Sequence, residues 1–343
     1  MSRAKQDEAA LPHPRTTAVL FGHHDAEQTL LGDYRGGRIA HAWLLGGPPG
    51  IGKATLAYRM ARFVLAHPDP ASPAVQSATS LAVSPDAPAA RRVAGQAHPD
   101  LLVLERTVGD NDKLRSVITV EQVRRTVGFF GSTAGEGGWR VCIVDAADEL
   151  KYPEGPNALL KVLEEPPRRS LFLVVSHAPG RLLPTIRSRC RRLTLRPLGE
   201  DDVVKAATAA LGEAADAAAL RQAARAADGS VARAIALAGG PQLALRDKVT
   251  ALLDRLPATD PRDLHALGDS IERGDDLFEV FIETARHWLS GRLDRTAEPA
   301  RLARVAEAWD KLNRAAIDTE TYNLERKPLV FNVFSLLAEA ARG

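Results

Sequence analysis

The stretch Gly47-Pro-Pro-Gly-Ile-Gly-Lys53 decides the fold of the first half of this 343-residue chain. It follows a short apolar run, HAWLL at residues 41–45, and precedes residues 54–66, whose apolar spacing predicts a helix. A strand, a loop of the form G-x-x-x-x-G-K and a helix, in that order, are typical of a site that cradles phosphate groups. Glycines let backbone N–H groups turn toward phosphate oxygens, and the helix N-terminus and the lysine add positive charge. The predicted phosphate-binding residues are Gly47, Gly50, Gly52 and Lys53.

Further apolar runs alternate with helical segments up to about residue 197. Each run is nearly continuous in its hydrophobicity, which is typical of strands buried on both faces of a parallel sheet. Strands that alternate with helices predict an α/β layered domain over residues 1–197. Besides 41–45, the expected strands are LLVL at 101–104, RVCIVD at 140–145, LFLVVS at 171–176 and RLTL at 192–195.

The rest of the chain predicts helices. Residues 198–240 are rich in Ala, and acidic residues follow Leu198 where a helix is expected to begin, so we expect a small helical domain. Residues 241–343 show helical spacing and no strand pattern, which predicts a helix bundle. Within the first domain, residues 67–97 carry five prolines among Ala and Ser. We expect them to form a long, exposed and flexible loop.

Composition and charge exclude several classes of protein. Hydrophobic residues make up 45% and charged residues 26%, which excludes a disordered tail, a collagen-like fibre and a coiled-coil rod. Two cysteines without a C-x-x-C pair cannot form a disulfide scaffold or a structural zinc site. No apolar stretch reaches the roughly 18 residues of a membrane span, so we expect a soluble, cytoplasmic protein. A net charge of +2 excludes a surface that is basic throughout, although a local basic patch is compatible with it.

The loop lacks one group that an ATP-hydrolysing site of this type needs. The residue after Lys53 is Ala54, where a Ser or Thr hydroxyl would bind Mg²⁺. Thr55 comes one residue later and lies about 100° further around the helix, so it does not simply replace that hydroxyl. We therefore expect no resident metal at this position.

A second group is missing at the end of the strand 140–145. The strand ends in Asp145, a candidate Mg²⁺ ligand, but the next residue is Ala146 where an active ATPase usually has a Glu that activates water. Asp148 and Glu149 follow, and we expect them to cap the start of a helix. With both groups absent, the sequence predicts a degenerate nucleotide site without hydrolysis. Its candidate residues are the four loop residues together with Thr55 and Asp145.

Several segments, taken with the loop, resemble the clamp-loader branch of the AAA+ ATPases, and within it the delta-prime family of bacterial DNA polymerase III. The run NALLKVLEEPP at residues 157–167 and the triplet Ser188-Arg-Cys190 are specific to clamp loaders. The other matching segments are LFGH at 20–23, HPDL at 98–101 and VEQV at 120–123. The resemblance is strong over about residues 11–200 and weak beyond. It implies a P-loop AAA+ domain with a parallel sheet, a small helical lid domain at 198–240 and a C-terminal helical collar domain at 241–343 for oligomerisation.

The resemblance also implies a function. The chain would be a non-hydrolysing subunit of a hetero-pentamer with gamma/tau-type ATPases and delta-type subunits, with no membrane partner. This complex of the DNA polymerase III holoenzyme loads the β sliding clamp onto primed DNA. In the family, the arginine matching Arg189 is an arginine finger that reaches the ATP of a neighbouring subunit, where a fixed cation stabilises the transferring phosphate. The alternatives are an ATP-hydrolysing motor subunit of the gamma type and a different AAA+ adaptor or recombination helicase, against which the triplet 188–190, the run 157–167 and the all-helical third region argue.

The resemblance bears on nucleotide binding as well. The family's lid arginine that contacts nucleotide aligns with Ala232 here, and Arg233 lies beside it. His177 ends a predicted strand near a family sensor position, with a hydrogen-bonded strand-end residue as the alternative. No cofactor is required, and ATP or ADP is the candidate ligand. A nucleotide held without turnover and a remnant loop that binds none are both compatible with the sequence.

Three further features follow from the resemblance. Family members often carry a four-cysteine zinc module in the area of residues 67–97, which have no cysteine here, so no zinc is expected. Glu164 and Glu165 are expected to end a helix before a Pro-Pro pair and to support a subunit interface. The arginines between residues 181 and 196 are candidates for contacts with DNA phosphates.

Overall fold

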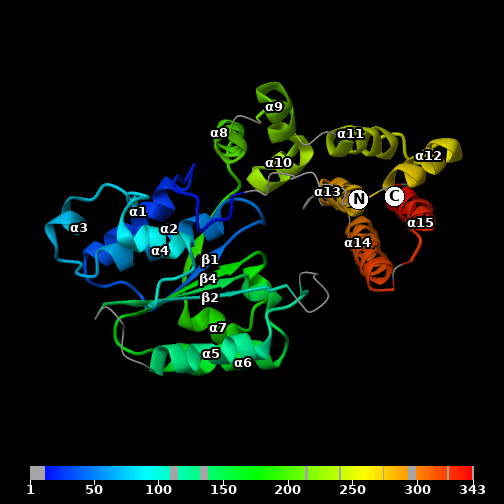
Figure 1. The fold of residues 1–343 in the computed structure, drawn as a ribbon. Coiled ribbons are helices and arrows are strands. Elements are labelled where there is room, and N and C mark those ends of the chain that lie inside the picture. Colours follow the sequence, from blue (N-terminus) through cyan, green and yellow to red (C-terminus); the bar gives the residue numbers. More distant parts are fainter. Residues whose placement is uncertain are drawn as a thin grey trace, which may run out of the picture. The chain divides into compact units, whose positions relative to one another are not determined.

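The computed structural model describes residues 12–108, 115–131, 138–212, 215–238, 241–272, 274–292, 299–322 and 324–341. The chain divides into two compact units, the first ending at Ile235 and the second starting at Ala236. The boundaries expected at residues 197 and 240 stay predictions. The first unit contains a five-stranded sheet in the order β2-β3-β4-β1-β5 with every pairing parallel, which confirms the predicted sheet (Figure 1). The strands are β1 (Ala42–Gly46), β2 (Leu101–Glu105), β3 (Arg140–Asp145), β4 (Ser170–Ser176) and β5 (Arg191–Thr194).

Helices cover both faces of this sheet. On one face, α1 (His24–Arg35) and α2 (Lys53–Ala66) pack against every second strand residue, such as Trp43 and Ile143. On the other face, the intervening residues, such as Leu44 and Val144, pack against three helices that lie together in Figure 1. These are α5 (Val120–Gly131), α6 (Glu154–Glu164) and α7 (Pro184–Arg189). The three central strands are therefore buried on both faces, as their continuous hydrophobicity predicts.

The two edge strands differ from the prediction. Side chains of β5 are exposed or half-buried, and those of β2 alternate between buried and half-buried. The expectation of burial on both faces is wrong for these strands, because an edge strand has a neighbouring strand on one side only.

Residues 67–97 do not form the long exposed loop that their composition suggests. Two short helices, α3 (Pro73–Ser77) and α4 (Pro88–Ala94), each begin with a proline. The fixed φ angle of proline suits the first position of a helix, so these prolines begin helices although proline elsewhere interrupts them. Val75, Leu81 and Val93 are buried in the core on the α1–α2 side. These three apolar positions are too widely spaced to give a periodic pattern.

The first unit also contains shorter elements and the helices of the expected lid. Two 3₁₀ turns, η1 (Ala147–Glu149) and η2 (Pro179–Arg181), follow β3 and β4. Then come α8 (Glu200–Leu211), α9 (Ala217–Ala226) and α10 (Val231–Ala238), the last of which crosses the division between the two units. Three acidic residues stand in the first turn of α8, as predicted. A small core around Val203, Ala224 and Ala234 holds these helices together.

Over its described residues, the second unit consists of helices, as the spacing predicts. They pack around buried side chains such as Phe281, Leu289, Leu312 and Leu337. The helices are α11 (Pro241–Leu253), α12 (Pro261–Ile271), α13 (Asp275–Ser290), α14 (Pro299–Thr321) and α15 (Arg326–Ala341). None of the helices in the described part of the chain is both long enough and apolar enough to cross a membrane.

Candidate functional site

The glycine-rich loop joins the carboxyl end of β1 to the start of α2. Lys53 is the first residue of α2, and it is only 3% exposed. Its Nζ donates to the carbonyl oxygen of Gly47 at 2.8 Å and also to that of Pro48. Burial lowers the pKa of Lys53 to about 8, against the opposing attraction of Asp145 and Asp148. The ammonium is thus fixed within the loop, where it can act as a local positive charge.

Three loop glycines adopt positive φ angles, at Gly47 (153°), Gly50 (73°) and Gly52 (97°). Gly50 approaches α10 closely, because a Cβ built there would lie 2.2 Å from Ser230 Oγ and 2.9 Å from the Cβ of Ala232. The N–H of Val231 donates to the carbonyl oxygen of Gly50 at 2.9 Å. The loop therefore lies directly against the start of α10.

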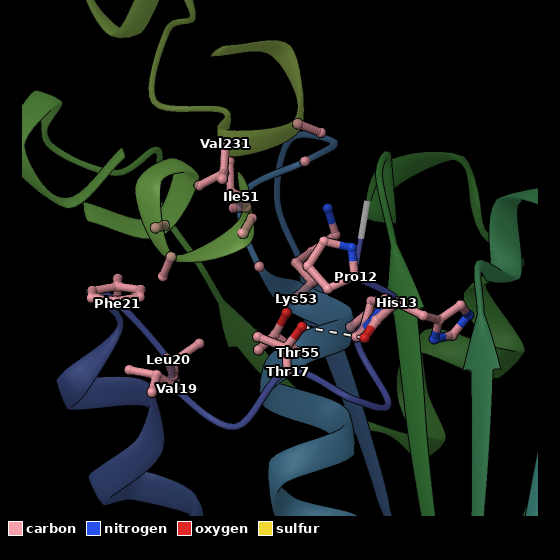
Figure 2. Close-up of a pocket in the computed structure, with 18 of the residues that line it drawn as sticks. Pro12, His13, Thr17, Val19, Leu20, Phe21, Ile51, Lys53, Thr55 and Val231 are labelled. Atoms are coloured by element: carbon pink, nitrogen blue, oxygen red, sulfur yellow. Dashed lines mark hydrogen bonds between the residues drawn. The ribbon is translucent and has the colours of Figure 1, made fainter. Parts of the chain in front are cut away.

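A cavity of about 620 Å³ opens beside the loop. Its walls come from residues 12–21, from the start of α2 and from α8 and α10 (Figure 2). Apolar residues dominate the lining, with Val19, Leu20 and Phe21 on one segment and Val231 and Ile235 on α10. An apolar cavity of this size with a few polar groups is typical of sites for small ligands and cofactors.

Two buried arginines of α2 hold residues 12–21 in place, a role that was not predicted from the sequence. Arg59 and Arg62 lie on α2, and each is only 6% exposed. Arg62 donates to the carbonyl oxygens of Arg15 at 2.9 Å and Thr17 at 2.6 Å. Arg59 forms an ion pair with Glu27 at 2.7 Å and donates to the carbonyl oxygen of Ala18. The signal in the sequence was the placement of two arginines inside an otherwise apolar helix.

The structure brings most of the predicted nucleotide-binding residues together. Gly50, Gly52, Lys53, Thr55 and Asp145 line the cavity, whereas Gly47 belongs to the loop without lining it. Asp145 ends β3 opposite Glu105 of β2. Burial, reinforced by the charges of Glu105 and Glu149, raises the pKa of the Asp145 carboxyl to about 6.

The donor set does not fit Mg²⁺ bound as in an ATPase of this type. Ala54 also lines the cavity, so a methyl group stands where the hydroxyl ligand would be. Ala146 follows Asp145 and is 2% exposed. Oxygen groups are therefore missing at both positions that the sequence identified.

Asp148 and Glu149 lie in the first turn of η1, where the Glu149 carboxylate bonds with the Ala146 backbone, so the expected capping is wrong only for Asp148. Its Oδ1 accepts from Ser176 Oγ at 3.0 Å and from the Ala178 N–H at 3.0 Å, and its Oδ2 accepts from the His177 N–H at 2.6 Å. The carboxyl ends of β3 and β4 lie side by side in the parallel sheet, so a carboxylate after β3 reaches the backbone after β4. The neighbouring Glu149 forms an ion pair with Arg106 at 2.9 Å.

Two further positions sit at the cavity. Ala232 lines it, while the adjacent Arg233 forms an ion pair with Asp228 at 2.7 Å. His177 also lines the cavity, and burial together with the charge of Lys53 lowers its pKa. Both positions therefore offer the cavity less positive charge than an arginine would.

Arg189 lies apart from this cavity, at the end of α7. Its side chain is 34% exposed and forms an ion pair with Glu164, with 2.8 Å between Nη2 and Oε1. Its Nη1 donates to the carbonyl oxygen of Thr185 at 3.0 Å. Glu164 is the last residue of α6, which confirms that this pair of glutamates ends a helix. Arg189 does not line the cavity of its own chain.

Comparison with known proteins gives a consistent picture. The sequence model of the family described as "DNA polymerase III, delta subunit" matches residues 22–199, just over half of the chain. The DNA polymerase III subunit delta' of Pseudomonas aeruginosa is 41% identical over 165 residues, covering 48% of this chain and 46% of that protein. The Escherichia coli K12 subunit delta' is 32% identical over 178 residues, covering 52% and 48%. The chain thus spans about half the length of these relatives.

Two further similarities are weaker. The DNA polymerase III subunit gamma/tau of Mycobacterium tuberculosis H37Rv is 31% identical over 187 residues, covering 54% of this chain and 29% of that protein. A solved DNA polymerase III gamma subunit-related protein from Thermotoga maritima is 17% identical. It covers 91% of this chain and 99% of its own, with a TM-score of 0.46.

Proposed function

The chain belongs to the family of DNA polymerase III delta subunits, and on this premise we propose that it is a non-hydrolysing, delta-prime-type subunit of a clamp loader. In this proposal it joins gamma/tau-type ATPases and delta-type subunits in a cytoplasmic hetero-pentamer that places the β sliding clamp on primed DNA. Its helical second unit contributes to the collar through which the subunits associate. The named delta' relatives and the parallel-sheet fold support this assignment.

The observation that carries the non-hydrolysing role is the buried Ala146 directly after Asp145. Hydrolysis needs a group that takes a proton from the attacking water, and a methyl group cannot accept one. Ala54 removes a metal ligand from the same site. For the cavity itself we propose ATP or ADP as a ligand held without turnover. Backbone N–H groups of the loop and the Lys53 ammonium supply the positive potential for its phosphates.

The exposure of Arg189 supports its proposed role in a neighbouring site. A guanidinium keeps its charge at any physiological pH and presents N–H donors in a planar fork that matches phosphate oxygens. Placed at the transferring phosphate, such a group stabilises the negative charge of the transition state. Because Arg189 lies outside the cavity of its own chain, the ATP that it serves is that of another subunit.

One observation favours the alternative of an ATP-hydrolysing motor. Glu149 lines a small second cavity together with Asp145 and His177, so a carboxylate is present close to the site. Burial raises the pKa of Glu149, which favours proton acceptance, whereas its ion pair with Arg106 already engages the carboxylate and opposes that role. Measuring ATP turnover by the isolated chain distinguishes the non-hydrolysing subunit from the motor subunit.

The experiment is a reconstitution. Purified delta-type and gamma/tau-type subunits are mixed with and without this chain, and loading of the β clamp onto primed DNA is measured beside ATP turnover by the chain alone. We expect loading to depend on the chain and the isolated chain to hydrolyse no ATP above background. Loading that proceeds equally well without the chain would contradict the proposed assignment. Turnover by the isolated chain that is lost in Glu149→Ala would establish the motor alternative.

A further inference from the structure

The ion pair between Arg189 and Glu164 joins two segments of the sequence that the proposed function leaves separate, the triplet 188–190 and the run 157–167. We propose that Glu164 is a positioning residue for Arg189. The Glu164 carboxylate holds one part of the Arg189 guanidinium, so that the remaining donors face the phosphate bound by the neighbouring subunit. This inference rests on the proposed role of Arg189 as an arginine finger.

The hydrogen-bond inventory of the guanidinium supports positioning. An arginine has five N–H donors in a fixed plane. Glu164 forms an ion pair with Nη2 at 2.8 Å, and the Thr185 carbonyl oxygen accepts a hydrogen bond from Nη1. Within the described part of the chain these contacts involve only Nη1 and Nη2, so the Nε donor is available for an incoming phosphate. The intrachain contacts can therefore persist while the finger acts.

Both anchors stand on well-fixed elements. Glu164 ends α6, and Thr185 lies in α7 four residues before Arg189. The two helices pack on the same face of the sheet, where Leu163 and Ile186 are buried in one core. A group whose contacts are mounted on packed helices keeps its geometry better than one on a mobile loop.

The energetic role of this pair is orientation rather than stability. Glu164 and Arg189 have side chains that are 48% and 34% exposed, and exposed ion pairs contribute little to folding. Loss of position matters more, since small misplacements of a catalytic group are costly in rate. Removing Glu164 should therefore slow the reaction while leaving the fold intact.

The test is ATP turnover by the reconstituted loader carrying full-length variants of this chain. Glu164→Ala should lower kcat roughly three- to tenfold with little change in KM for ATP, because the finger acts on the transition state. Glu164→Asp keeps the carboxylate charge that pairs with the guanidinium and should recover part of this loss. Glu154→Ala is the matched control and should leave turnover unchanged, since Glu154 is an exposed glutamate at the opposite end of the same helix, α6. In an Arg189→Ala background, Glu164→Ala should have no further effect.

The outcomes separate this inference from the proposed function. If Arg189→Ala does not change turnover, the finger itself is refuted. If Arg189→Ala slows turnover but Glu164→Ala does not, or if Glu164→Ala accelerates it, the positioning role is refuted while the finger stands. A further loss from Glu164→Ala in the Arg189→Ala background would also overturn the inference, because Glu164 would then act independently of Arg189. Unchanged thermal unfolding of each variant shows that the fold is intact.

Discussion

Lys53 and Asp145 line the same cavity, and burial opposes the charged form of both residues. The pKa of Lys53 falls to about 8 and that of Asp145 rises to about 6, so each group is held at some cost to the folded state. A bound phosphate would favour the charged form of Lys53. For Lys53, this cost is consistent with the proposed role in phosphate binding.

Asp145→Asn is expected to stabilise the chain, increasingly so as the pH rises. A carboxyl whose pKa is raised in the folded state contributes stability below its unfolded pKa, and this contribution is lost as the pH rises through the folded value of about 6. The difference in free energy of unfolding between Asp145→Asn and the natural chain should therefore grow from pH 4 to pH 6 and level off above. Urea unfolding across this range measures it, and a difference independent of pH would refute the environment assigned to Asp145.

At the scale of elements, the contact between the glycine-rich loop and α10 rests on Gly50. Gly50→Ala should destabilise the first unit by about 1–3 kcal/mol, because φ is 73° and the added Cβ would meet Ser230 and Ala232. Gly32→Ala in α1 is the matched control, since its Cβ meets nothing within 4 Å. We expect this control to be neutral or slightly stabilising. Denaturant unfolding compares the two, and equal stability of both variants would contradict the close contact.

The segment 67–97 gives a second prediction at this scale. Leu81 is fully buried, so Leu81→Ala should cost about 2–5 kcal/mol in free energy of unfolding. Asp86→Ala, at an exposed position of the same segment, should change it by less than about 0.5 kcal/mol. If the segment were the flexible loop that its prolines suggest, both substitutions would be nearly neutral in the same unfolding experiment.

The elements show what the sequence could predict and why the rest escaped. Central strands such as β3 and β4 can be predicted from the sequence, because a strand buried on both faces needs an unbroken apolar run. The packing of Leu81 depends on a contact of its backbone N–H with Glu27, which stands 54 residues earlier. The role of Asp148 likewise depends on which strands are neighbours. Such contacts leave no local pattern in the sequence.

At the scale of the whole molecule, the predicted site residues fall into two places with different tasks. The loop, Thr55 and Asp145 could be grouped from the strand–loop–helix order, and the fold brings them to one cavity. Only the structure shows that residues 12–21 form an apolar wall of this cavity and that Arg62 anchors them. Arg189 was identified by resemblance to a family. The structure adds its ion pair with Glu164, which the sequence did not predict.

The central claim is that this chain serves the ATP site of a neighbour rather than its own. The most direct measurement is ATP turnover by the reconstituted loader with Arg189→Ala or Lys53→Ala in this chain. We expect Arg189→Ala to slow turnover roughly tenfold or more, and Lys53→Ala to leave it within about twofold of the natural rate. Loss of turnover in Lys53→Ala, with an isolated natural chain that hydrolyses ATP, would contradict the account and make this subunit a motor.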